Sequence, residues 1–148
     1  DLGETDFAFR IAKTALDAWK REVEYSYYTF EMFNITSGRG GWFHNFGGLS
    51  TPINIWTNAY FKLGTFSTGL DTMVMESNFN EDKTEFKATV KYYGNNDKYS
   101  VIVVLRDEFD YSVTVNNNKA DFSLRDKGTI EITLDGNEKS AEIEIVKA

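Results

Sequence analysis

The chain has 148 residues, of which 41% are hydrophobic and 26% are charged, and its formal net charge is −7. This hydrophobic content is enough for a packed core and argues against bulk disorder. The negative charge argues against nucleic acid and anionic membranes as partners, because both attract a basic protein face. The chain has no cysteine for a disulfide or thiolate site. No run reaches the roughly 20 apolar residues of a membrane span.

The composition changes near Asp71. All three tryptophans and most phenylalanines precede it, whereas lysine, glutamate and alternating apolar positions dominate after it. Such a shift is typical of a domain boundary. We therefore expect a helical unit over residues 1–71 and a β-sandwich over residues 72–148.

The first segment, residues 6–34, has the apolar spacing of an amphipathic helix. Thr5 or Asp6 can cap its start, and Asn34 with the glycines beyond it can end it. The apolar positions recur at steps of three and four residues and form one stripe. They are Phe9, Ile11, Ala12, Ala15, Leu16, Trp19, Val23, Tyr27 and Phe30.

A glycine- and aromatic-rich loop over residues 35–48 leads to a second predicted helix. Ser50 or Thr51 can cap this helix, and Pro52 fits its first turn. Gly64 ends it. Two helices cannot bury so wide an aromatic stripe unless the sandwich or additional helices cover it. We therefore expect residues 1–71 to be the last hairpin of a larger helical assembly, whose remaining hairpins are partners of this segment.

The remaining segments alternate apolar and polar residues with the period of two that is typical of β-strands. Asparagine- and glycine-rich turns separate them. Short strands at this spacing predict an antiparallel sandwich of immunoglobulin-like size. The expected strands begin near Thr72, Phe86, Val101, Tyr111, Ala120, Ile130 and Ala141.

Three short runs carry a resemblance to a known family. They are Phe-Glu-Met-Phe-Asn at 30–34, Thr-Ser-Gly-Arg-Gly at 36–40 and Asn-Phe-Gly-Gly-Leu-Ser at 45–50. Together they resemble the closing motif of trehalase-like and glucosidase-I-like glycoside hydrolases, over roughly residues 6–64. That family implies an α+β chain, in which the last hairpin of a six-hairpin α/α toroid precedes the sandwich.

The resemblance also implies a function. It suggests an inverting enzyme acting on α-glucoside-type substrates, with Glu31 as the general base. The general acid, an Asp of an earlier hairpin, is absent, so the isolated chain should be inactive. No cofactor is implied, and a secreted or periplasmic location is favoured. The residues that would contact the carbohydrate are Tyr27, Phe33, Asn34, Trp42, His44 and Asn45.

The chain departs from the family pattern at two positions. Phe33 replaces a tyrosine and loses its hydroxyl group, and Gly48 stands where a tryptophan usually stacks on sugar. Glu31 also has an alternative interpretation as a solvated helix-end carboxylate that pairs with Arg39. The residues alone therefore leave the role of Glu31 open.

Other candidates have two interpretations each. His44 could bond a sugar or have a structural role, and Trp42 could stack on sugar or anchor its loop. The sequence Asn34-Ile35-Thr36 is a glycosylation sequon, which we discount because Asn34 belongs to the motif.

The acidic cluster Asp107, Glu108 and Asp110 could hold calcium but fits a solvated turn better. For the whole chain, the alternative function is a non-catalytic carbohydrate-binding or structural accessory module.

Overall fold

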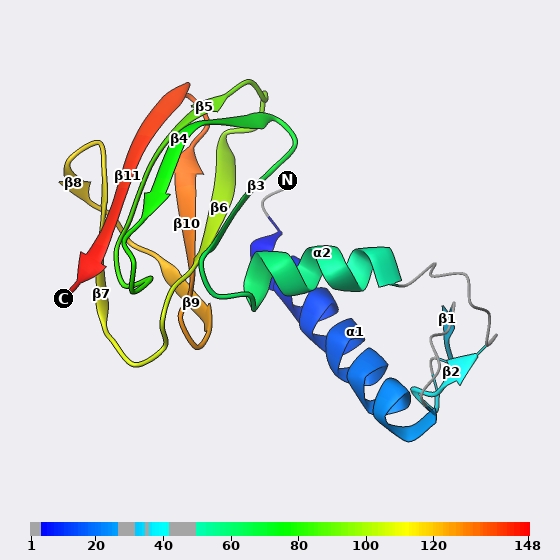
Figure 1. Cartoon of the computed structure of the whole chain (residues 1–148). Helices are drawn as coiled ribbons and strands as arrows, with labels where there is room; N and C mark the ends of the chain where they lie inside the picture. Colours follow the sequence, from blue (N-terminus) through cyan, green and yellow to red (C-terminus); the bar gives the residue numbers. More distant parts are fainter. Residues whose placement is uncertain (1–3, 27–31, 35, 42–49) are drawn as a thin grey trace. The chain divides into compact units, whose positions relative to one another are not determined.

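The computed structural model describes residues 4–26, 32–34, 36–41 and 50–148 (Figure 1). The chain forms two compact units. One holds Ala59–Ala148 together with the N-terminal segment Asp1–Thr5, and the other holds Asp6–Asn58. No helix among the described residues is long and apolar enough to cross a membrane.

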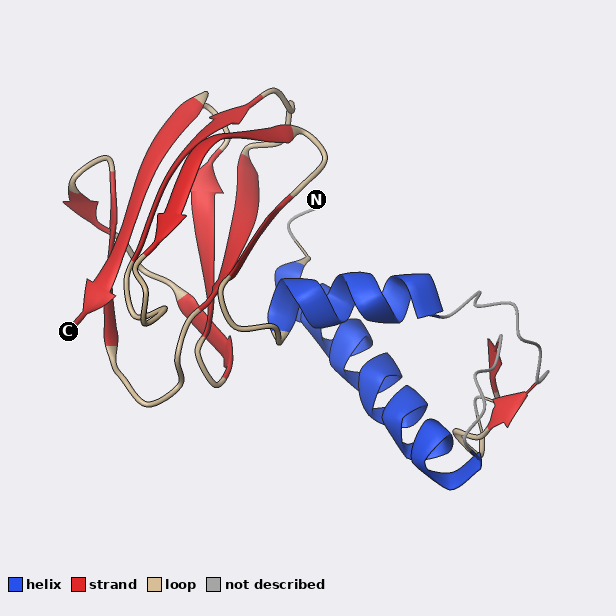
Figure 2. Cartoon of the chain, viewed as in Figure 1, coloured by secondary structure: helices blue, strands red, loops and turns tan. Residues whose placement is uncertain are grey.

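The prediction of a hairpin from an α/α toroid is wrong. The described chain is mostly antiparallel β-sheet and has two helices, α1 (Thr5–Ser26) and α2 (Ser50–Tyr60) (Figure 2). The predicted first helix was to reach Asn34, but α1 ends at Ser26. Two short strands, β1 (Met32–Phe33) and β2 (Gly40–Gly41), occupy part of the chain assigned to that helix and its loop.

The physical reason lies in the residues between β1 and β2. The Asn34 side chain accepts hydrogen bonds from the backbone N–H groups of Thr36 and Ser37. Such local bonds give the backbone an alternative to a helix. Gly38 has a φ of +64°, which interrupts a right-handed helix and suits a tight turn. The predicted helix was longer than α1 because the spacing of apolar residues contains no information about these turn hydrogen bonds.

The β-rich unit contains two antiparallel sheets, in agreement with the sandwich part of the prediction (Figure 1). The four-stranded sheet has the order β3 (Thr65–Thr68), β6 (Lys98–Val104), β10 (Thr129–Asp135) and β9 (Ser123–Asp126). The five-stranded sheet has the order β4 (Thr72–Phe79), β5 (Phe86–Tyr92), β11 (Ser140–Lys147), β7 (Tyr111–Val115) and β8 (Asn118–Lys119). The boundary expected between residues 71 and 72 falls between β3 and β4.

One apolar core joins the two sheets. In β5 and β11 every second side chain is buried, which follows from the alternating sequence because successive strand side chains point to opposite faces. In β10 the residues from Thr129 to Ile132 are all buried. At one end of the core, Tyr92 and Tyr99 stack with their ring centres 4.1 Å apart and their planes at 2°. The least exposed core residues include Phe86, Val101, Val103, Ile130, Ile132 and Ile145.

The β-rich unit also holds both chain segments that lead into and out of the helical unit. Arg125 on β9 pairs with Glu131 on β10 and donates from Nη2 to Thr5 Oγ1 at 2.8 Å. The hydroxyl of Thr129 donates to the carbonyl oxygen of Tyr60, at the end of α2. These two contacts fix Thr5 and Tyr60 to the four-stranded sheet.

Candidate functional site

The β1–β2 hairpin carries the described part of the glycosidase-like motif. The backbone N–H of Asn34 donates to Arg39 O at 2.8 Å, and the N–H of Gly38 donates to Asn34 O at 2.8 Å. The Asn34 Oδ1 atom accepts from Thr36 N at 3.0 Å and from Ser37 N at 2.9 Å. In this structure Asn34 therefore shapes the turn with its carboxamide oxygen.

Glu22 ties the hairpin to α1. The Arg39 guanidinium donates to its carboxylate from Nε at 2.7 Å and from Nη2 at 3.1 Å. The Glu22 side chain is only 2% exposed, and paired, bidentate geometry is what makes such a buried charge tolerable. The carboxylate also accepts a backbone hydrogen bond from Gly40.

The titration of this pair follows from its hydrogen bonds. The bond from Arg39 lowers the pKa of Glu22, against the opposing effect of burial, and the Gly40 bond acts in the same direction as Arg39. The same contact with Glu22 raises the pKa of Arg39. Both groups are therefore held in their charged forms.

Arg39 has a second contact on its guanidinium plane. Its Cζ atom lies 4.5 Å from the centre of the Tyr25 ring, at the end of α1. The carbonyl oxygen of Gly38 accepts a further hydrogen bond from Arg21 Nη2 at 3.4 Å. Helix and hairpin are thus linked by three side chains of α1, namely Arg21, Glu22 and Tyr25.

The structure describes two of the seven residues assigned to the site. Asn34 forms the turn, and the backbone of Phe33 lies in β1 opposite Gly40. The other five lie outside the described residues. They are Tyr27, Glu31, Trp42, His44 and Asn45.

Glu22 was not predicted as a site residue, and Glu31 was the possible partner of Arg39. In the structure, Arg39 pairs with Glu22. One signal could have identified it: Glu22 lies three residues after Trp19, on the apolar stripe of α1. A carboxylate on an apolar stripe requires a partner.

The acidic residues of the sandwich that were candidates for a calcium site do not form a metal-binding group among the described residues. Within the described ranges, no group of three His, Cys, Asp or Glu side chains could hold a metal ion. Asp107, Glu108 and Asp110 are all exposed, and Glu108 lies 3.9 Å from Arg106. This arrangement fits the solvated turn, the interpretation favoured from the sequence.

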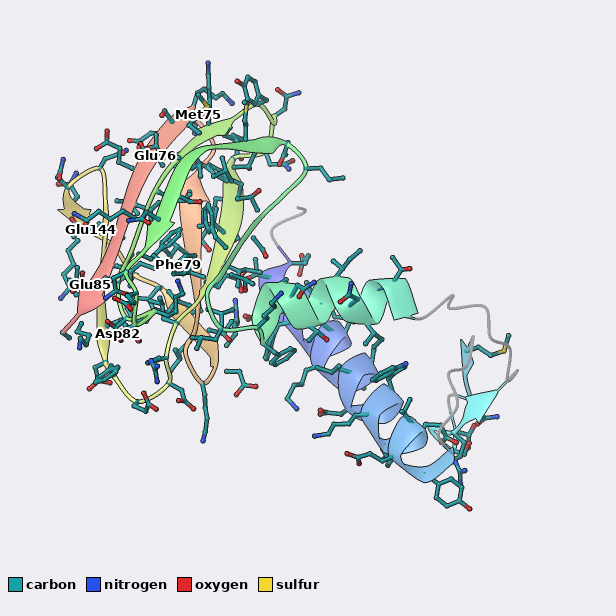
Figure 3. All side chains as sticks on the ribbon, in the orientation of Figure 1. Met75, Glu76, Phe79, Asp82, Glu85 and Glu144 are labelled. Atoms are coloured by element: carbon teal, nitrogen blue, oxygen red, sulfur yellow. The ribbon has the colours of Figure 1, made fainter. Side chains whose placement is uncertain are left out.

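The outer face of the five-stranded sheet carries an open groove of about 430 Å³. Lys87 on β5 and Glu144 on β11 lie opposite each other in the strand register and pair at 2.7 Å. Figure 3 shows Glu144 and Glu76 on this unit. Among the described residues no aromatic side chain lines the groove, so their side chains offer hydrogen bonds and charge but no stacking surface for a sugar.

Neither the scan against protein-family models nor the search of curated proteins finds a match to this chain. The resemblance to glycoside hydrolases therefore depends on the motif between residues 30 and 50. The hairpin that carries part of this motif is the candidate functional site.

Proposed function

We propose that this chain is part of a glycoside hydrolase that cleaves α-glucoside-type substrates with inversion, and that Glu31 supplies the general base. The observation that supports this most is the described half of the motif. Its turn at Asn34 is tied to α1 through the buried carboxylate of Glu22. Catalytic groups work best next to elements whose own side chains are locked by packing and hydrogen bonds. The proposal concerns the chemistry and does not include a toroidal fold.

The mechanism requires two carboxyl groups. In an inverting glycosidase, the base removes a proton from a water molecule that attacks the anomeric carbon. A protonated acid on the opposite side donates its proton to the leaving oxygen as the glycosidic bond breaks. The two groups lie about 6.5–9.5 Å apart. In this proposal Glu31 is the base, and another segment of the enzyme supplies the acid.

The test replaces Glu31 by Gln in the full-length enzyme that contains this chain. We expect the turnover number for an α-glucoside to fall by about 10²–10⁴, which is the usual contribution of a general base. Glu24→Gln on the exposed side of α1 is the matched control and should leave turnover unchanged. Proton NMR of the first product should show the inverted anomer. A Glu31→Gln enzyme within a few-fold of the wild type would end the assignment.

A second candidate is a structural accessory module. The observation that favours it is the attachment of both Thr5 and Tyr60 to the four-stranded sheet, within the β-rich unit. Under this alternative, Glu31→Gln has no effect on turnover. Glu131→Gln, which weakens the attachment at Thr5, should lower the amount of folded protein under either candidate, so the effect of Glu31→Gln on turnover separates the two.

A further inference from the structure

We propose that Tyr25 and Arg39 form a stacking subsite for a pyranose ring. Tyr25 is 72% exposed, although the guanidinium of Arg39 lies 4.5 Å from its ring centre. With Arg39 on one side, this degree of exposure leaves the opposite ring face open to solvent. The choice of an α-glucoside as ligand rests on the proposed function, but the geometry of the subsite does not.

A buried carboxylate holds Arg39, one of the two side chains of the subsite, in place. Glu22 is buried and bonds two nitrogen atoms of Arg39, which fixes the plane of the guanidinium. The fixed guanidinium in turn holds the Tyr25 ring by a cation–π contact. A side chain fixed before the ligand arrives loses little conformational entropy on binding. Tyr25 is therefore an ordered aromatic surface.

The chemistry of this surface suits a sugar. The apolar CH groups of a pyranose can pack on an aromatic face, which combines a large apolar area with a polar edge. Arg39 keeps 52% of its side chain exposed, and its Nη1 atom takes no part in the two bonds to Glu22. Its N–H groups can donate to ring hydroxyls because arginine carries five donors. Stacking and hydrogen bonding then act on the same sugar.

Tyr93 provides a matched control on the other unit. It is 59% exposed, and the Nζ atom of Lys91 lies 5.4 Å from its ring centre. The cation beside Tyr93 is a lysine on a flexible stem, whereas Arg39 is a planar group held by a buried carboxylate. Exposure and a nearby cation are thus shared, and the fixed support is specific to Tyr25.

The experiment measures binding of maltose and of trehalose to the full chain by NMR titration. We expect amide shifts in α1 and the hairpin, and about tenfold weaker binding in Tyr25→Ala. Tyr25→Phe keeps the ring and should bind within twofold of the wild type. Tyr93→Ala should bind as the wild type does. Thermal unfolding and hairpin amide exchange confirm that each variant stays folded.

The outcomes separate this proposal from the proposed function. If Tyr25→Ala binds both sugars as tightly as the wild type, or if Tyr93→Ala weakens binding equally, the subsite is wrong. The absence of any sugar binding by the folded chain also overturns it. If Glu31→Gln leaves hydrolysis intact while Tyr25→Ala still weakens binding, the subsite stands and the catalytic assignment falls. In the full-length enzyme, Tyr25→Ala should raise KM and leave kcat unchanged.

Discussion

Arg125 and Glu131 form an ion pair on the outward side of β9 and β10 that is almost closed to water, with side chains 14% and 3% exposed. Lys87 and Glu144 make a comparable pair on the five-stranded sheet, but their side chains are 70% and 42% exposed. Both pairs join a basic side chain to a glutamate, but one basic group is a guanidinium and the other an ammonium, and their surroundings differ. They therefore offer a direct comparison of buried and surface charges within one unit.

Glu131→Gln should destabilise the protein by about 3–5 kcal/mol, because it leaves the Arg125 charge buried without its carboxylate. Glu144→Gln should change the free energy of unfolding by about 1 kcal/mol or less, since water and salt screen an exposed pair. Urea unfolding followed by tyrosine fluorescence measures both. Equal losses in the two variants would contradict the difference in burial.

The Glu22–Arg39 pair predicts a pH dependence in the hairpin. The pKa of Glu22 is lowered below its usual 4.5, with the hydrogen bond from Arg39 as the largest cause. A lowered folded-state pKa adds stability above the unfolded value, and that stability disappears as pH falls through the folded pKa. Amide exchange at Asn34 and Gly38 should accelerate below about pH 4.5 relative to the intrinsic rate. Glu22→Gln should remove this dependence, and Glu24→Gln should keep it.

Tyr99 predicts an effect at high pH. Burial is the main cause that raises the pKa of its hydroxyl to about 12, from an ordinary value of 10.0. A group whose folded pKa is raised contributes stability below its unfolded pKa, and this is lost as pH rises through the folded value. The stability of the sandwich should therefore fall between about pH 10 and pH 12. Ultraviolet titration should show a tyrosine component that ionises near pH 12 in the wild type and is lost in Tyr99→Phe.

The same variant tests the cost of a buried hydroxyl. The Tyr99 oxygen has no hydrogen-bond partner within the described part of the chain. An unsatisfied buried polar group costs about 1–3 kcal/mol, so Tyr99→Phe should be at least as stable as the wild type at neutral pH. Urea unfolding at pH 7 measures this. A loss of more than about 1 kcal/mol would show that the hydroxyl is bonded after all.

The helices leave apolar side chains at the surface. Phe7 and Ile11 on α1 are 51% and 43% exposed, and Ile55 on α2 is 58% exposed. Clustered apolar surface binds hydrophobic dyes and favours association. The chain should therefore enhance the fluorescence of such a dye, and Phe7→Gln with Ile11→Gln should lower that signal. Leu124→Gln on β9, where the side chain is 63% exposed, is a control in the other unit.

The strands of the sandwich were predictable because their information is local. Phe86, Ala88 and Val90 alternate with polar residues in the sequence, and the structure buries all three. The turns between strands were marked in the same way by asparagine and glycine. Strand alternation and turn chemistry each depend on a few neighbouring residues, so a single sequence suffices to recognise them.

The helical half was predicted less well because its signals were incomplete. The three- and four-residue spacing continued to Phe30 and suggested a helix ending at Asn34, whereas α1 ends at Ser26. The bonds from Thr36 and Ser37 to Asn34 favour a turn and have no periodic signature. The motif at 30–34 was visible in the sequence, but the Glu22 carboxylate that supports its hairpin was not recognised.

The sequence by itself determined the antiparallel sandwich, since each strand is encoded in a short run of alternating residues. The resemblance to glycoside hydrolases stays a prediction. Tertiary structure decided which charges are buried. Glu131 alternates with Ile130 and Ile132, as a solvent-facing residue would, yet it is closed off beside Arg125, which also bonds Thr5. Glu22 is likewise paired with Arg39, 17 positions away. A charged carboxylate can be buried only where another group of the chain pairs with it. The fold determines which groups come close enough to pair.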